Sequence, residues 1–370
     1  MAFNVTKPVN NNLLLVIDGA SLVATNFYGS IPIYIQNEKD VDKANQLCRK
    51  ELRQTKDGTY TNSVASTLAT IFGLINFYKP THVAVCFDKS SKTTFRKMMY
   101  PDYKANRATK PDALKEQMDT TRLILKNIGI PSFWADKYEA DDLAGSLITH
   151  FKHECGKVLF VTKDHDWLQL IDQNVTGIIM QKSEEVAANM RVEYGKFAPE
   201  NNDATDPFNP KTYRKCVTFN AEITYIEDGV YPKQIPDLKG LAGDSSDNIP
   251  GAKGIGPGTA VPLLQRYHSV EGIYAAIDKC KGDETLLNQL AEDMKTHGIK
   301  RNPLQKLMDG RDAALLSKNL ATIVTDIPIN FPLDNLKYRL KYDMLQIAVN
   351  HYELDEFQYM VDNHTMENEV

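Results

Sequence analysis

The chain has 370 residues, of which 42% are hydrophobic and 25% are charged, as in ordinary globular proteins, and its net charge is −5. No segment reaches the roughly 20 apolar residues of a membrane span, and the first twelve residues lack a signal-peptide pattern, so we expect neither membrane insertion nor export. Five widely spaced cysteines without a C-x-x-C pair argue against disulfides or zinc and favour a reducing cytoplasm.

Three apolar runs, at residues 13–17, 82–87 and 157–162, predict buried strands of a parallel sheet with helical segments between them. Each run is followed by aspartate. These are Asp18, Asp88, and the pair Asp164 and Asp166. Ligands of open α/β sheets bind beyond the carboxyl ends of the strands. One such aspartate is often a turn former or helix cap, but three strand ends together predict a site.

A basic segment follows the second predicted strand. Residues 89–126 hold ten Lys/Arg and four Asp/Glu, although the whole chain is acidic. Lysine and arginine alternate there with Tyr100 and Tyr103, which could stack on unpaired bases. A solvated helix face is the alternative, and it fits poorly because the segment starts at the proposed edge of the site. Basic charge beside a carboxylate cluster is typical of metal-using enzymes that act on polyanions.

Two further acidic motifs follow. Glu139, Asp141 and Asp142 open a predicted helix that runs to about residue 151, where acids could simply complement the helix dipole. Asp244 and Asp247 lie in a segment that could be a turn-rich loop, and the downstream glutamate that a calcium-binding EF-hand loop requires is missing. So many carboxylates at one place would repel one another unless cations were bound. Oxygen-only ligation favours Mg²⁺ or Mn²⁺, and two ions about 4 Å apart could support phosphodiester hydrolysis.

A glycine-rich motif at residues 251–260 precedes a predicted helix. A lone G-x-G-x-G is weak evidence, and a dinucleotide fingerprint would require a strand just before it. The preceding residues are typical of a loop, so a helix–hairpin–helix fits better. Its backbone N–H groups and the helix N-terminus could hold a phosphate without reading sequence. A purely structural turn remains the alternative.

Together, and in this order, the motifs resemble the 5′-3′ exonuclease family, which includes the N-terminal nuclease domain of bacterial DNA polymerase I, stand-alone bacterial and phage exonucleases and, more distantly, flap endonucleases. The resemblance implies an α/β fold: a PIN-like parallel sheet flanked by helices, with a helical arch and a helix–three-turn–helix DNA-binding module. No polymerase follows, so we expect a stand-alone bacterial or phage enzyme. The strings that carry the resemblance are residues 16–19, 87–88, 103–107, 138–142, 164–166 and 243–251.

The resemblance also implies roles for individual residues. The first metal site would use Asp18, Asp88, Glu139 and Asp141; the second would use Asp164, Asp166 and Asp247, with Asp244 and Asp142 close by. Catalysis would depend on Asp18 and Asp141 together with Lys104 and Arg107 at the scissile phosphate. DNA contacts are expected from Arg96, Tyr103, Lys104, Arg107, Lys253, Gly254, Gly256, Gly258 and Thr259. A potassium ion is expected at the hairpin.

The predicted organisation is a nuclease core at 1–185 with an arch at about 89–127, an insertion and connection at 186–235, a DNA-binding module at 236–350, and a solvated acidic tail at 351–370.

Three departures from the family pattern stand out. Thr25-Asn26 replaces an expected arginine, which removes one substrate contact. Lys163 and His165 stand where relatives usually have a small residue and a lysine. Residues 183–231 form a longer stretch than expected, with a polar centre at 200–206.

The expected function is metal-dependent hydrolysis of DNA at 5′ flaps, nicks or free 5′ ends, with RNA primers as a further substrate, by a monomeric enzyme of replication and repair in the cytoplasm of a bacterium or of a phage-infected cell. Three alternatives remain. One is a catalytically inactive protein that binds flaps or branched DNA. Another is a phosphatase that uses Asp164 and Asp166 as nucleophile and acid. The third is a ribonuclease of similar fold. The balance of exonuclease and flap cutting is left open.

Overall fold

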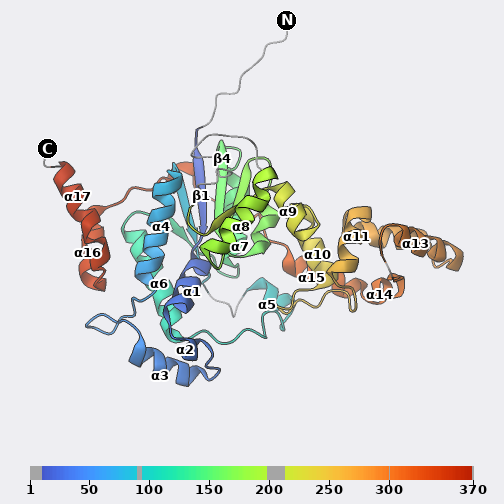
Figure 1. Cartoon of the computed structure of the whole chain (residues 1–370), viewed down its shortest axis with the longest axis horizontal. Helices are drawn as coiled ribbons and strands as arrows, with labels where there is room; N and C mark the ends of the chain where they lie inside the picture. Colours follow the sequence, from blue (N-terminus) through green and yellow to red (C-terminus); the bar gives the residue numbers. More distant parts are fainter. Residues whose placement is uncertain (1–10, 90–93, 198–212, 300, 369–370) are drawn as a thin grey trace, which may run out of the picture.

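The computed structural model describes residues 11–89, 94–197, 213–299 and 301–368. Its centre is a six-stranded sheet with the strand order β3-β2-β1-β4-β5-β6 (Figure 1). The strands are β1 Leu13–Asp18, β2 His82–Cys86, β3 Ser132–Phe133, β4 Lys157–Thr162, β5 Val175–Met180 and β6 Cys216–Phe219. Five strands are parallel and β6 runs antiparallel to β5. The predicted parallel sheet is therefore confirmed, with an antiparallel edge strand added.

The three strands predicted from apolar runs are neighbours at the middle of the sheet. Asp18 pairs with Cys86 of β2, and Ile17 pairs with Val161 of β4. Because the strands are parallel and in register, their carboxyl ends meet at one edge. This arrangement brings the residues after β2 and β4 next to Asp18.

Side chains of the central strands alternate between two hydrophobic cores, as the period of a strand requires. Leu15 and Ile17 belong to the core covered by α1, α4 and α6, and Leu14 and Val16 belong to the core covered by α7. Helix bounds in the first half of the chain are α1 Gly19–Ser30, α2 Ile33–Gln36, α3 Val41–Glu51, α4 Val64–Tyr78, α5 Phe95–Met99, α6 Asp112–Asn127, α7 Ala140–Phe151, 3₁₀ helix η1 His165–Leu170, α8 Glu184–Tyr194 and η2 Gly195–Phe197.

A helical module follows β6 and extends away from the sheet (Figure 1). Leu241, Leu263 and Ile273 in this module share one core cluster with Leu147 of α7 and Phe160 of β4. The module is therefore built onto one face of the nuclease sheet. Its helices are α9 Ala221–Asp228, η3 Pro232–Gln234, α10 Ile235–Ala242, α11 Pro257–Tyr267, α12 Val270–Lys279, α13 Glu284–Thr296, α14 Leu304–Asp309, α15 Arg311–Ala321 and η4 Leu333–Leu336.

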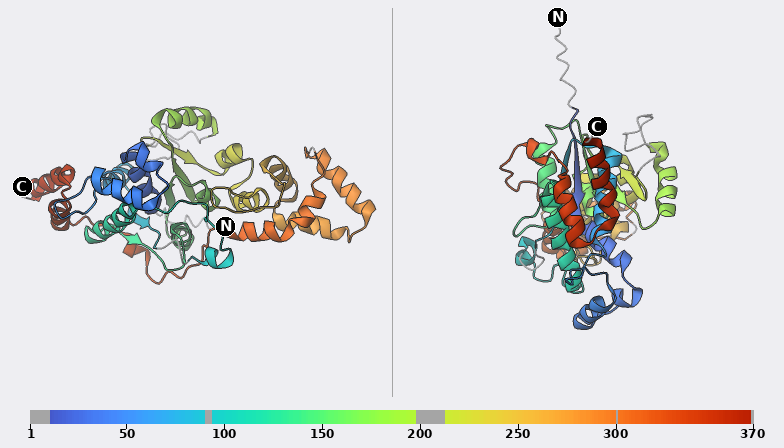
Figure 2. Two further views of the ribbon diagram at one scale, coloured as in Figure 1. Left: turned by 90° about the horizontal axis from the view of Figure 1, so that it is seen from below. Right: turned by 90° about the vertical axis from the view of Figure 1, so that its left-hand side faces the viewer.

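The last helices, α16 Tyr342–Tyr352 and α17 Gln358–Asn368, flank η5 Asp355–Phe357 and return to the nuclease core. Figure 2 shows them in red at the end of the molecule opposite α13. The prediction of a solvated tail is wrong for Leu354, Phe357 and Val361, which are buried in the same core as α1 and α4. Spaced apolar side chains among the acids anchor this segment.

Two other predicted boundaries also change. Helix α6 buries Leu114, Ile124 and Leu125 in the core, so the described part of the predicted arch that precedes this helix is residues 94–111, which we call the arch segment. The stretch predicted as an insertion contains α8, β6 and α9, and β6 completes the sheet. Its polar centre, residues 200–206, lies outside the described residues. Among the described residues, no helix is long and apolar enough to cross a membrane.

Candidate active site

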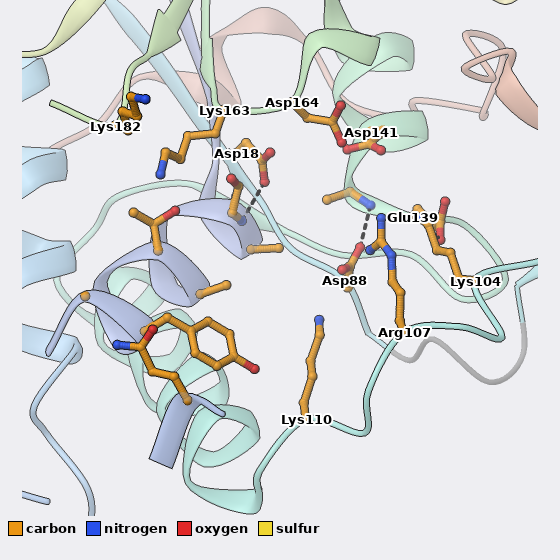
Figure 3. Close-up of a pocket in the computed structure, with 18 of the residues that line it drawn as sticks. Asp18, Asp88, Lys104, Arg107, Lys110, Glu139, Asp141, Lys163, Asp164 and Lys182 are labelled. Carbon is orange, nitrogen blue, oxygen red and sulfur yellow. Dashed lines mark hydrogen bonds and ion pairs between the residues drawn. The ribbon is translucent and has the colours of Figure 1, made fainter. Parts of the chain in front are cut away.

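Asp18 lies at the centre of the site, at the end of β1 (Figure 3). Its carboxylate accepts hydrogen bonds from Ser21 N–H at 2.9 Å, which caps α1, and from the Thr162 hydroxyl at 2.7 Å. Only 3% of the residue is exposed. Burial raises the pKa of Asp18 to about 7, and the nearby carboxylates of Asp88 and Asp164 contribute to the rise.

The start of α7 supplies the next carboxylates. Asp88 accepts a hydrogen bond from Ala140 N–H at 2.9 Å, which ties the end of β2 to the first turn of the helix. Glu139 is the N-cap residue of α7. Asp141 accepts a hydrogen bond from Trp167 Nε1 at 2.7 Å, and burial together with Asp164 and Asp18 holds its pKa well above the usual range.

These groups line one open cavity of about 770 Å³, and Lys104 and Arg107 line it as well. The structure therefore brings together all four residues predicted for the first metal site, and it adds Asp164 from the predicted second site. Figure 3 shows these side chains converging on the space beyond the strand ends. The acids of the cavity are Asp18, Asp88, Glu139, Asp141 and Asp164.

The remaining acids of the predicted second site pair with basic side chains. The ammonium group of Lys239 in α10 lies between Asp166 and Asp244, 2.6 Å from Asp244 Oδ2. Arg107 pairs with Asp247. Burial and Asp164 raise the pKa of Asp166 to about 7 against the opposing effect of Lys239. Sequence reasoning missed Lys239, although it lies only about one helical turn before residues 243–251, which hold Asp244 and Asp247 and which we call the acidic loop.

The basic arch segment is docked on that acidic loop. Lys104 has a positive φ of 54°, and its backbone N–H donates to the Asp247 carbonyl at 2.8 Å. Its ammonium group lies 2.8 Å from Glu139 and 3.6 Å from Asp247. The side chains of Asn106 and Asn248 cross-link the two segments through the carbonyls of Ser245 and Asp102. Lys104 and Arg107 thus reach the cavity while they neutralise carboxylates.

The predicted DNA contacts of Arg96 and Tyr103 do not fit the structure, because both side chains are buried. Arg96 is 2% exposed and donates to both carboxylate oxygens of Asp142 at 2.7 Å and to the carbonyls of Leu320 and Thr322 at 2.8 Å. Tyr103 is 3% exposed, and its hydroxyl donates to Glu139 at 3.0 Å, so its ring is not available for stacking on a base.

Asp142 is likewise a structural residue in this arrangement. It is fully buried and accepts hydrogen bonds from the backbone N–H groups of Glu139 at 3.0 Å and Val324 at 2.9 Å, in addition to the two from Arg96. With Glu139 it forms a capping box. Its acceptor positions are thereby occupied, which contradicts its predicted place beside the second metal.

Within the described residues, no group of three or more acidic, histidine or cysteine side chains forms a ready-made metal site. The donor set nevertheless suits a hard divalent cation, because five carboxylates line one cavity and supply only oxygen ligands. The raised pKa values of Asp18 and Asp141 reflect burial of negative charges close together, a cost that a bound cation would relieve. In this structure Lys104 and Arg107 neutralise part of this negative charge by pairing with Glu139 and Asp247.

The glycine hairpin between α10 and α11 exposes its tip. Lys253, Gly254, Gly256 and Gly258 are exposed and Thr259 is partly exposed. Gly254 has a φ of +80°, which favours glycine, and its carbonyl accepts a hydrogen bond from the Lys306 ammonium group at 3.0 Å. The space beside Gly256 and Gly258 is open, so a phosphate could approach the N-terminus of α11.

Family comparison agrees with this architecture. The family model described as "5'-3' exonuclease, N-terminal resolvase-like domain" matches residues 13–195. A second family model, described as "5'-3' exonuclease, C-terminal SAM fold", matches residues 230–343. The first match covers strands β1 to β5 of the nuclease sheet, and the second covers the helical module from η3 to η4. The chain belongs to the 5′-3′ exonuclease family.

Two curated relatives illustrate its relationships. The chain is 37% identical to DNA polymerase I of Caldicellulosiruptor bescii over 284 residues, which is 76% of this chain but 28% of the polymerase. It spans less than a third of such polymerase relatives. It is 27% identical to the 5'-3' exonuclease of Bacillus subtilis, with coverage of 96% of this chain and 97% of that protein.

The solved structures include the T5 5′-exonuclease with bound divalent metal ions (zinc), at a TM-score of 0.55 and 20% identity, covering 95% of this chain and 99% of that one. A structure of the bacteriophage T5 flap endonuclease with DNA and metal ions matches with a TM-score of 0.52, 20% identity, and 95% and 98% coverage. These neighbours share the fold described above.

Proposed function

We propose that the protein is a divalent-metal-dependent 5′-nuclease that hydrolyses phosphodiester bonds of DNA at free 5′ ends, nicks and 5′ flaps. The observation that carries this proposal is one cavity in which carboxylates face Lys104 and Arg107. These carboxylates come from the end of β1, from the second residue after β2 and after β4, and from the start of α7. Carboxylates for cations and basic groups for phosphate are the two requirements of phosphodiester hydrolysis.

Asp18, Asp88, Glu139 and Asp141 would hold the cation, with Asp164 beside them. A bound cation would supply the Lewis acid that activates water and polarises the phosphate. Mg²⁺ fits the oxygen-only donors, and Mn²⁺ should substitute for it. A second ion would require Asp166 and Asp247 to exchange their present partners, Lys239 and Arg107.

Lys104 and Arg107 would act on the phosphate itself. A polyanionic substrate competes with Glu139 and Asp247 for these two cations, so they can transfer to a phosphate at the cavity. There they would offset the negative charge that develops during hydrolysis. The exposed hairpin with Lys253 and Gly254 would bind backbone phosphates of the duplex, with a potassium ion as a further proposed ligand.

The relatives support this proposal. The T5 neighbour has been solved with divalent metal ions and with DNA, and the Bacillus subtilis relative is named a 5'-3' exonuclease. By analogy we propose DNA replication and repair as the context, with RNA primers as a further substrate, and a monomer as the working form. Five free and buried cysteines are compatible with the proposed cytoplasmic location.

The first test uses a 5′-flap DNA labelled at its 5′ end, incubated with the protein in Mg²⁺, Mn²⁺ or EDTA. We expect short labelled products in either metal and none in EDTA. Asp18→Asn should remove cutting, whereas Asp119→Asn, an exposed acid of α6 paired with Arg122, should not. Tight binding of the flap without cutting in both metals would identify an inactive binding protein instead.

A further inference from the structure

A second group of basic residues lies at the same edge of the sheet as the carboxylates. Lys163 follows the end of β4, Lys182 lies two residues after the end of β5, and Lys215 directly precedes β6. Because β6 is antiparallel, its first residue lies at the edge where β5 ends, and Gln181 N–H donates to the Lys215 carbonyl at 2.8 Å. The sheet topology therefore places three lysines side by side.

These lysines line a cavity that also holds carboxylates, among them Asp164 next to Lys163 in the chain. In the part of the chain that the structure describes, none of the three forms an ion pair, unlike Lys104, Arg107 and Lys239. Unpaired cations gathered at one place repel one another, so they gain stability from a bound anion.

All three lysines line the same cavity as the carboxylates. Figure 3 shows Lys163 and Lys182 on one side of Asp18, and Lys104 and Arg107 on the other side. A strand whose scissile phosphate lies at the carboxylates would therefore have two separate basic contacts. One is the arch, and the other is the group Lys163, Lys182 and Lys215, which we call the strand-end lysines.

We propose that the strand-end lysines bind the terminal 5′-phosphate of the DNA strand that is cut. A terminal phosphate carries up to two negative charges, whereas an internal phosphodiester carries one, so the three lysines favour the terminal group. The cavity volume of about 770 Å³ leaves room for a short 5′-terminal segment between the lysines and the carboxylates. Tyr28 and Gln36 line the same cavity.

This inference rests on the proposed nuclease function and adds a preference to it. The enzyme should remove short products from 5′-phosphorylated ends more efficiently than from 5′-hydroxyl ends. An internal phosphate of a longer flap could also reach the same lysines. Binding of an internal phosphate should not depend on whether the 5′ end carries a phosphate or a hydroxyl group. Substrates that differ only in the terminal group separate the two.

The experiment compares kcat/KM on two duplexes with a recessed 5′ end, identical except for a 5′-phosphate or a 5′-hydroxyl. For the native protein we expect a preference of about tenfold or more for the phosphate, the effect of one charge-assisted hydrogen bond. The triple variant Lys163→Gln, Lys182→Gln, Lys215→Gln should bring the ratio close to one, mainly through KM. Arginine at the same positions should preserve it.

The matched control is Lys126→Gln, Lys337→Gln, Lys341→Gln, which removes the same charge from exposed lysines away from the cavity. It should retain the native ratio, and thermal unfolding should verify that both triple variants are folded. Binding of the two duplexes in EDTA provides a readout without cutting, and the native protein should favour the 5′-phosphate there too.

The outcomes separate the two proposals. If the protein cuts both ends equally and the triple variant is unchanged, the lysine site is refuted and the nuclease function stands. An equal loss on both ends in the triple variant would assign the lysines to internal phosphodiesters and overturn the terminal assignment. If nothing is cut but the lysines confer preferential binding of the 5′-phosphate in EDTA, the nuclease proposal fails and the site is supported.

Discussion

At the scale of single residues, the dominant feature of the site is that its basic side chains form ion pairs with its carboxylates. Lys104 pairs with Glu139, Arg107 pairs with Asp247, and Lys239 bridges Asp166 and Asp244. These acids are the groups proposed to bind cations. A metal ion and a basic side chain therefore compete for the same oxygen atoms, and metal uptake would release basic groups that can contact DNA.

Lys239→Met tests this competition. Removal of the ammonium group leaves Asp166 and Asp244 facing each other without a cation, so the metal-free protein should lose about 1–3 kcal/mol of stability. The same change should strengthen Mn²⁺ binding, because the competing charge is gone. Thermal unfolding in EDTA and titration calorimetry with Mn²⁺ measure the two effects. The control is Lys233→Met, an exposed lysine near the start of α10; equal Mn²⁺ affinity of both variants would contradict the competition.

Arg96→Met tests the structural role assigned to this buried arginine. The substitution leaves the buried Asp142 carboxylate without its charged partner, which should cost about 3–5 kcal/mol. Urea unfolding measures this loss, and the double variant Arg96→Met, Asp142→Leu should recover part of it. Lys97→Met on the same helix should cost much less. Retained stability with weaker DNA binding would instead support the original prediction of a DNA contact.

At the scale of elements, the arch segment is held by the acidic loop of the helical module. Asn248 has a φ of 56°, and its side chain donates to the Asp102 carbonyl at 2.7 Å. Arg96 fixes the other side of the segment through the carbonyls at the end of α15. The arch is therefore a joint product of the nuclease sheet and the module.

Asn248→Gly and Asn248→Ala separate the contributions of the hydrogen bond and of the backbone. Glycine accepts the positive φ and loses only the side-chain bond, whereas alanine also adds strain of about 1–2 kcal/mol. In metal-free protein, both should speed trypsin cleavage after Lys104 or Arg107, with alanine the faster. Unchanged cleavage in both variants would mean that this cross-link does not hold the arch.

The sequence predicted those elements that are indicated by residues close together in the chain. Apolar runs located β1, β2 and β4, and the aspartates that follow them indeed meet at one edge. The role of Arg96 could not be predicted, because its partners at Leu320 and Thr322 lie more than 200 residues away and are backbone carbonyls. The bridge from Lys239 to Asp166 and Asp244 was missed for another reason, because it joins Asp244, five residues away, to Asp166, 73 residues away, and only the fold brings these two acids together.

At the scale of the whole molecule, the nuclease sheet and the helical module share one core. Phe160 of β4 and Leu263 of α11 lie in the same cluster of buried residues. The two parts matched by separate family models therefore pack against each other through buried side chains.

A shared core predicts one cooperative unfolding transition. Far-ultraviolet circular dichroism and tryptophan fluorescence should give coincident urea curves, since both Trp134 and Trp167 lie in the nuclease half. A fragment that ends at residue 230 should expose the apolar face beneath the module and aggregate or remain unfolded. A soluble fragment of this kind with a cooperative transition would contradict the interpretation.

The sheet itself is long at its centre and short at its edges. Strands β1, β4 and β5 have six residues each, whereas the edge strands β3 and β6 have two and four. Unpaired backbone groups on an edge strand can add a strand from another copy of the chain, and short edges limit this reaction. The molecule should thus resist strand-mediated aggregation even when concentrated, and its copies should remain separate on a crowded DNA substrate.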